Sequence, residues 1–316
     1  MSRFYVGIDV GGTAIKFGIF DEKKILLDKF SIATNIVEKN NEKHLLNSIF
    51  VAIDDYCKSN KYKVKKNLII GIGLTMPGPV VNNNLLHAVN INWKKKINIV
   101  SEIQKIFGEK IKVSVLNDAN AAALGEYEKF LKAKYNSMAL ITLGTGVGTG
   151  VIINGKLIEG KSGIAGELSH IRIDYAEDAL RCNCGNVGCV ETVAGAVGLK
   201  KLYLKLKGND NIQIENLYEP ISAKGIIDKA KERDELANAA LDKSFGYVSD
   251  LIVILMHVYE PEVVVIGGGL SNAGTFITKI IEKHLHEKIF MTKTFPKIII
   301  AKLKNDAGIY GAVSKF

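Results

Sequence analysis

The sequence predicts an α/β protein that folds as two related lobes. Its 316 residues suit about two domains, strand-like and helix-like segments alternate along the chain, and a pattern near the N-terminus returns 133 residues later. A hydrophobic content of 47% is enough to build a core in each lobe. The longest apolar run, residues 251–256, is far too short to cross a bilayer, so no membrane association is expected.

Residues 6–23 and 139–156 carry the repeated pattern. In both copies an apolar strand leads into a turn rich in glycine and threonine, then a second strand and a third, the latter expected at 24–30 and 156–159. Because glycine lets backbone N–H groups approach an anion closely, each turn is a candidate for holding a phosphate group. The alternative is a pair of tight hairpin turns with no ligand.

The remaining elements follow from hydrophobic periodicity and helix-start signals. Residues 41–59 are expected as an amphipathic helix and residues 67–74 as a buried strand. The further expected strands are 112–116, 262–266 and 297–301, and the further expected helices are 120–131, one from Thr192, 222–231, 234–259, 275–285 and 309–316. We expect a smaller lobe of residues 1–117 and 302–316, and a larger one of residues 118–301 with a metal site and a dimer surface.

Residues 155–162 match the Walker A expression letter for letter. A Walker A loop needs a preceding strand and a helix that begins at its Lys-Ser pair. Here Asn154 and Gly155 are a hairpin-turn signal, and Gly163 follows the serine. We therefore interpret the match as coincidental.

Three of the four cysteines, Cys182, Cys184 and Cys189, lie within eight residues, and His170 lies twelve positions upstream. Three thiolates and one imidazole are the ligand set of a closed, structural Zn²⁺ site. The alternative is a disulfide with spare thiols, but the N-terminus shows no secretory signal, so a reducing cytoplasm is expected. A nucleic-acid zinc ribbon would need a second knuckle of paired cysteines. Cys57 is expected to be an inert thiol.

The formal charge of +9 raises the question of a nucleic-acid partner. The lysines are dispersed, however, and no basic stripe interleaved with aromatic residues occurs. A solvated lysine-rich surface that attracts an anionic substrate fits better, and no nucleic-acid partner is expected.

Asp118 is the candidate catalytic residue. With Asn117 it follows the expected strand 112–116, and ligands of open α/β folds gather beyond the carboxyl ends of strands. A carboxylate there suits a general base that takes a proton from a sugar hydroxyl during phosphoryl transfer. The alternative is a helix N-cap. The two glycine turns and Asp9, at the end of the first strand, favour the catalytic role.

Glu167 and Glu191 flank the cysteine cluster and are candidates for accepting hydrogen bonds from sugar hydroxyls. Surface salt bridges are the alternative for either one alone. On a helix, Glu167 and His170 would share a face, but a di-iron site would need further glutamates on partner helices. His170 is expected to give one nitrogen to the metal and the other to a ligand or acceptor.

Three loops complete the candidate site. Gly78, in the rigid Pro-Gly-Pro loop, could offer backbone groups to a substrate, and Asn90 could bind hydroxyls. A run of three glycines after the strand 262–266 would let a nucleotide base or ribose lie flat against the backbone, although a simple strand-to-helix turn explains it equally well. These glycines are Gly267, Gly268 and Gly269.

With these residues in hand, the chain resembles the ROK family (repressors, open reading frames, kinases) over essentially its whole length, and within it the ATP-dependent glucokinases of bacteria. The resemblance rests on Asp9-x-Gly-Gly-Thr-x-x-Lys16, the Pro-Gly-Pro loop, Asn117-Asp118-Ala119, Gly144-Thr145-Gly146-x-Gly148, Gly166-Glu167-x-x-His170 and Cys182-x-Cys184-Gly-x-x-Gly-Cys189-x-Glu191. The cysteine signature is the specific part.

The resemblance implies an actin-like sugar-kinase fold of two lobes closing on ligand across a cleft, as a homodimer or a tetramer. It implies ATP and Mg²⁺ as cofactors and a hexose, most closely glucose, as acceptor. Asp118 would be the base, Mg²⁺ would lie near Asp9, and Zn²⁺ would be bound by His170, Cys182, Cys184 and Cys189. The sugar would be bound by Asn90, Asn117, Asp118, Glu167, His170 and Glu191, and the phosphates by Gly11, Gly12, Thr13, Lys16, Gly144, Thr145, Gly146 and Gly148.

The chain departs from the family pattern at two places. Ala88-Val89-Asn90 lacks the proline that often precedes this asparagine, and Thr149 stands where related glucokinases more often have glycine. The alternative acceptors are N-acetylmannosamine, N-acetylglucosamine or another hexose. A non-catalytic sugar-sensing regulator is a further alternative, but Asp9 comes too early to leave room for a helix-turn-helix extension.

Overall fold

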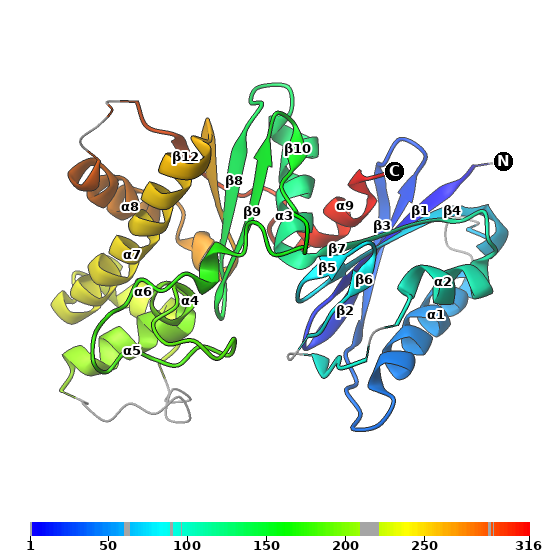
Figure 1. Ribbon diagram of the computed structural model, residues 1–316, viewed down its shortest axis with the longest axis horizontal. Coiled ribbons are helices and arrows are strands. Elements are labelled where there is room, and N and C mark those ends of the chain that lie inside the picture. Colours follow the sequence, from blue (N-terminus) through cyan, green and yellow to red (C-terminus); the bar gives the residue numbers. More distant parts are fainter. Residues whose placement is uncertain are drawn as a thin grey trace. The chain divides into compact units, whose positions relative to one another are not determined.

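The computed structural model describes residues 2–59, 64–88, 91–95, 97–208, 221–289, 292 and 294–316 (Figure 1). The chain divides into two compact units. Unit 1 comprises Met1–Lys132, Glu159–Ala165 and Asn305–Phe316, and unit 2 comprises Ala133–Ile158 and Gly166–Lys304. None of the helices in the described ranges combines the length and the apolar composition that crossing a membrane would require.

Unit 1 is built on a five-stranded sheet in the order β3-β2-β1-β4-β7. Its main elements are β1 (Phe4–Val10), β2 (Ala14–Asp21), β3 (Leu26–Ala33), α1 (Asn41–Ser59), β4 (Ile69–Met76), the hairpin β5 (Val80–Val81) and β6 (Asn84–Leu85), α2 (Ile99–Phe107), β7 (Lys112–Asn117), α3 (Asp118–Glu126) and α9 (Ala307–Ser314). The first three strands are antiparallel neighbours, whereas β1, β4 and β7 run parallel.

Unit 2 has a second five-stranded sheet in the order β10-β9-β8-β11-β12. Its elements are β8 (Met138–Leu143), β9 (Val147–Ile153), β10 (Lys156–Leu157), α4 (Glu191–Ala194), α5 (Ala196–Leu206), α6 (Ala223–Lys231), α7 (Glu235–Tyr259), β11 (Val263–Gly267), α8 (Thr275–Lys288) and β12 (Lys297–Ile300). The pairing again runs from an antiparallel meander to parallel strands. The predicted duplication is therefore confirmed strand by strand.

The repeat is not uniform within the first hairpin. Val10 pairs with Ile15, which leaves residues 11–14 in the turn, whereas Leu143 pairs with Val147 and leaves only residues 144–146. The expected offset of 133 therefore holds for the first strands and becomes 132 in the second strands, where Gly18 corresponds to Gly150. Comparison of the two sequence segments did not reveal this one-residue difference in turn length, because both segments are rich in glycine.

Both faces of the unit 1 sheet are covered by helices (Figure 1). Alternate residues of β1, including Val6 and Ile8, join the core formed with α1 and α2. The opposite face carries Tyr5 and Gly7, against which α9 packs. A side chain at Gly7 would meet the backbone of Ile309, so glycine is required for this helix to lie directly on the sheet.

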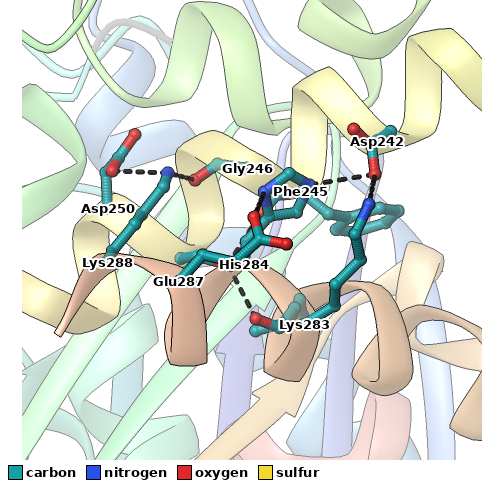
Figure 2. A network of polar contacts seen from close by, with 10 residues as sticks. Asp242, Phe245, Gly246, Asp250, Lys283, His284, Glu287 and Lys288 are labelled. Carbon is teal, nitrogen blue, oxygen red and sulfur yellow. Dashed lines mark hydrogen bonds and ion pairs between the residues drawn. The ribbon is translucent and has the colours of Figure 1, made fainter.

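The core of unit 2 joins β8, β9 and β11 to α5–α8. Outside the core, charged groups link the two long helices α7 and α8 (Figure 2). Lys288 Nζ lies 2.6 Å from Asp250 Oδ1 and donates to Gly246 O at 2.7 Å, while Asp242 Oδ1 lies 3.0 Å from His284 Nε2. These contacts span two helices and stabilise their pairing beyond the apolar contacts beneath them.

Several expected boundaries shift. The expected helix 120–131 begins two residues earlier and turns π-helical over Tyr127–Leu131. The expected strand 156–159 stops at Leu157, because Glu159–Ala165 leaves the sheet and belongs to unit 1. The helix expected from Thr192 begins at Glu191 and is interrupted at Gly195. The first unit extends to Lys132 rather than ending at residue 117, since α3 packs against α9.

Candidate active site and metal centre

The carboxyl ends of the parallel strands in unit 1 bring polar groups together. Asp9 at the end of β1 pairs in register with Thr75 of β4, and the neighbouring Met76 pairs with Asn117 of β7. The Thr75 hydroxyl donates to Asp9 Oδ1 at 2.7 Å. Thr75 was missed by the sequence analysis, although a threonine near the end of an otherwise apolar strand is a readable signal.

Asp9 is also held from the two sides of the strand. Lys16 Nζ lies 3.4 Å from Asp9 Oδ2 and donates to Asn305 O at 3.3 Å. A side chain at Gly308, at the start of α9, would lie 2.7 Å from the Asp9 carboxyl carbon. The first turn of α9 therefore faces Asp9.

Asn117, not Asp118, caps α3. The Asn117 side-chain oxygen accepts from Asn120 N at 3.0 Å, and its amide nitrogen donates to Gly78 O at 3.2 Å. Gly78 has a φ of +134°, and a side chain there would meet His87 O. The role of helix N-cap, considered as an alternative for Asp118, therefore belongs to its neighbour Asn117. The same Asn117 side chain also holds the Pro-Gly-Pro loop.

Asp118 is the first residue of α3, and its side chain is exposed to solvent. Its Oδ1 accepts from Ala119 N at 2.8 Å. Crowding by surrounding protein removes part of its hydration and raises the pKa of Asp118 to about 6, a shift that Ala119 N opposes and the charge of Asp9 reinforces. The carboxyl group is therefore both reachable from solvent and more basic than an ordinary aspartate.

The first glycine turn, residues 11–13, exposes its backbone. Gly11 N donates to Ala14 O at 3.0 Å, and Thr34 Oγ1 donates to Gly11 O at 2.7 Å. Gly12 and Thr13 are exposed to solvent. The turn is thus held through Gly11 while the next two residues remain accessible to a ligand.

The second glycine turn, residues 144–146, is held from behind by α5. Gly144 O and Thr145 O accept from the N–H groups of Ala196 and Val197, at 2.9 and 3.3 Å. A side chain at Gly146 would meet the carboxylate of Glu191, which would have to shift to make room. This turn is therefore in contact with one of the two predicted acceptor glutamates.

The three successive glycines after β11 differ in what they contact. Gly268 has a φ of +78°, and a side chain there would meet the backbone of Leu143, so this glycine allows β11 to end against β8. A side chain at Gly269 would meet nothing within 4 Å. Open space at Gly269 is compatible with a flat ligand group beside this turn.

The predicted metal ligands come together. Ligand atoms of His170, Cys182, Cys184 and Cys189 all lie within 4.8 Å of one another. The Cys182 Sγ–His170 Nδ1 distance is 3.5 Å and the Cys184 Sγ–Cys189 Sγ distance is 3.7 Å. In a zinc tetrahedron the corresponding edges are about 3.5 and 3.8 Å, calculated from usual Zn–N and Zn–S bond lengths. These two of the six ligand–ligand distances therefore match a tetrahedral site, and a cluster of three thiols and one imidazole has the donors that Zn²⁺ prefers.

The loop between the cysteines turns back on itself as predicted. Gly185 N donates to Cys182 O at 3.0 Å, and Gly185 and Gly188 both have positive φ angles. Burial and a 3.0 Å hydrogen bond to Glu191 Oε1 raise the pKa of the Cys182 thiol, so metal binding has to displace this proton. Cys57 lies elsewhere, and burial raises the pKa of its thiol, as expected of an inert cysteine.

Glu167 is not on an α-helix. It precedes a short 3₁₀ turn, Leu168–His170. The spacing between Glu167 and His170 is therefore that of a 3₁₀ turn and not that of an α-helix. Glu191 begins α4, where its carboxylate lies between Cys182 and Gly146.

Asn90, predicted to bind sugar hydroxyls, lies outside the described residues. The rejected Walker A match contains no helix after Ser162.

The fold and these motifs define a protein of the actin-like sugar-kinase class. The model of the ROK family matches residues 5–315, and the chain belongs to this family. It is 36% identical to a glucokinase from Halalkalibacterium halodurans, over 98% of this chain and 93% of that protein. It is 29% identical to an N-acetyl-D-glucosamine kinase from Haemophilus influenzae, over 99% of both chains.

Among solved structures, a ROK family glucokinase from Streptomyces griseus in complex with glucose and AMPPNP matches with a TM-score of 0.77. The two chains are 27% identical, and the match covers 99% of this chain and 98% of that one. The resemblance to the ROK family drawn from the sequence is therefore confirmed.

Proposed function

We propose that the chain is an ATP-dependent hexose kinase that transfers the γ-phosphoryl group to the 6-hydroxyl of glucose. The observation that carries the proposal is Asp118. Its carboxyl group is accessible, is not the cap of its helix, and has a pKa of about 6, close to the operating pH that general-base catalysis requires. The glucokinase relative with 36% identity supports glucose as the acceptor.

Unit 1 supplies the proton acceptor and a phosphate turn. Asp118 takes the proton from the attacking hydroxyl, and exposed N–H groups of Gly12 and Thr13, with the ammonium group of Lys16, bind phosphate oxygens. Asp9 is the carboxylate that would hold Mg²⁺, since it lies at the same edge of the sheet, where Thr75 and Lys16 contact its two oxygens. Mg²⁺ held there would neutralise phosphate charge.

Unit 2 supplies the sugar-binding carboxylates and the second phosphate turn. Glu167 and Glu191 accept hydrogen bonds from sugar hydroxyls and the metal-free ring N–H of His170 donates one, while the backbone of residues 144–146 and Gly148 binds phosphate. Gly267, Gly268 and Gly269 lie beside the nucleotide. A structural Zn²⁺ bound by His170, Cys182, Cys184 and Cys189 would fix the loop that precedes Glu191 in the chain. Gly78, Asn90 and Asn117 complete the proposed sugar contacts.

The test is an ADP-release assay with ATP and a panel of hexoses, run on the wild-type chain and on Asp118→Asn. Fastest turnover with glucose, abolished in the variant, is the expected result. Preference for N-acetylglucosamine would replace glucose by the acceptor that the Haemophilus influenzae relative suggests. ATP consumption with none of the sugars would contradict the proposal and favour a sugar-sensing regulator. We further expect a cytoplasmic homodimer or tetramer, which gel filtration with light scattering can check.

A further inference from the structure

Thr149 is a polar residue in an apolar row. On β9 it lies between Val147 and Val151, both part of the apolar core of unit 2, and its side chain is only 2% exposed. A valine would fill the same space without a hydroxyl group. Because a buried hydroxyl is costly unless it is hydrogen-bonded, its partners show what this threonine does.

The Thr149 hydroxyl group bridges the two residues that flank Glu167. It donates to the carbonyl of Gly166 and accepts from Leu168 N at 3.1 Å. Leu168 N also donates to Gly166 O at 2.8 Å, and Glu167 has φ −75° and ψ 52°. These values describe an inverse γ-turn with Glu167 at its centre. One hydroxyl group therefore binds both ends of the turn that presents this glutamate.

We propose that Thr149 is the positioning residue that fixes Glu167 for binding the sugar. The inference rests on the proposed function, in which Glu167 accepts hydrogen bonds from the hexose. An inverse γ-turn by itself is closed by one hydrogen bond, so without the hydroxyl group the turn opens more readily and the carboxylate moves. A displacement of about 1 Å in a binding group is enough to cost a large factor in activity.

The position of Thr149 also links two parts of the proposed site. β9 starts directly after the glycine turn of residues 144–146, and Thr149 is its third residue. The strand that carries the phosphate turn therefore also holds the sugar-binding glutamate. The carbonyl of Gly166 and the N–H of Leu168 are hydrogen-bonded to each other as well as to the hydroxyl group. Removing the hydroxyl group therefore leaves neither of these backbone groups unpaired.

The experiment compares Thr149→Val, which keeps the shape, with Thr149→Ser, which keeps the hydroxyl group. We expect Thr149→Val to weaken glucose binding, measured calorimetrically without nucleotide, and to raise the KM for glucose roughly tenfold, the effect of losing one or two hydrogen bonds. The KM for ATP should stay unchanged, and Thr149→Ser should restore sugar binding. The control is Thr278→Val on α8, another buried threonine with a hydrogen bond to a backbone carbonyl.

Amide hydrogen exchange of residues 166–171 tests the same contact without substrate. Exchange at Leu168 should be faster in Thr149→Val and protected in Thr149→Ser. Equal glucose affinity in the wild-type and valine proteins, or a serine variant as weak as the valine variant, would overturn the inference. A wild-type protein that binds no hexose would overturn the proposed function instead, while unchanged exchange at Leu168 would show by itself that Thr149 does not hold the turn.

Discussion

Replacing Asp118 by asparagine should abolish turnover and, at neutral pH, stabilise the protein. The replacement is isosteric, and the asparagine side-chain oxygen can still accept from Ala119 N, as Asp118 Oδ1 does at 2.8 Å. The fold and sugar binding should therefore persist. Loss of the general base lowers kcat by roughly 10²- to 10⁴-fold, because the attacking hydroxyl then has no group to take its proton.

The stability effect follows from the direction of the pKa shift. The pKa of Asp118 is about 6 in the folded protein and 3.8 in an unperturbed aspartate, so the folded state binds the proton more tightly. Folding stability from this group is complete below pH 4 and is lost as the pH rises through 6. The full shift would correspond to about 3 kcal/mol, but the side chain is exposed, and solvent screening reduces this to about 1 kcal/mol.

Two assays check this prediction together. Thermal unfolding should give Asp118→Asn a Tm about 2–4 °C above the wild type at pH 8, for a unit of this size, and no advantage near pH 4. The wild-type kcat/KM for sugar should rise with pH around an apparent pKa of about 6 and level off above it. A variant that keeps kcat within tenfold of the wild type, or a wild-type profile flat from pH 5 to 8, would refute the role of Asp118.

The remaining predictions concern the metal and two glycine-rich segments. Elemental analysis of the purified chain should find about one zinc ion. Verified removal of this ion by a chelator should raise the KM for sugar, because Glu191 follows the last proposed cysteine ligand. A KM for sugar that stays constant after the metal is removed would contradict this prediction. Gly146→Ala should weaken sugar binding, since the new methyl group meets the Glu191 carboxylate, whereas Gly225→Ala, with ordinary contacts on α6, should not. Lys161→Ala should leave the KM for ATP unchanged, because no helix begins at residues 161 and 162; a large rise would restore the Walker A interpretation.

Features set by local sequence were predictable. Helix starts at Ser222 and Asp234 were expected, and both residues cap their helices by accepting from Gly225 N and Ala237 N. The Cys/His cluster was also predictable, because three cysteines within eight residues with two glycines between them can turn to face one point. In each case the residues that make the feature lie within a few positions of one another, apart from His170.

Features that depend on distant partners were not predictable. Glu159–Ala165 follows a strand of unit 2 yet packs within unit 1, where Gly163 lies against Val80. Gly73 is a glycine because α9, more than 230 residues later, lies on that face of the sheet. The sequence marked Thr149 only as a departure from a pattern. Its role appears once β9 and the Gly166 segment are known to be neighbours.

The two sheets share one topology but differ in the residues near the carboxyl ends of their strands. Under the proposed function, these differences give the two units different roles. At the carboxyl edge of the first sheet, Asp9 and Thr75 are the last residues but one of β1 and β4, and β7 ends in Asn117, followed by Asp118. In the second sheet, Thr142 and Gly267 take the positions of Asp9 and Thr75.

Carboxylates at this edge in unit 1 suit a cation and a proton. In the second sheet Gly267 packs against Thr142 and Ala301, and the open space lies beside Gly269, two residues further on. The acidic groups of unit 2 are Glu167, before a 3₁₀ turn, and Glu191, at the start of α4, next to the Cys/His cluster. Under the proposed function, the duplicated fold would supply two similar phosphate turns. The strand ends of unit 1 would then serve proton transfer, whereas Glu167 and Glu191 of unit 2 would serve sugar recognition.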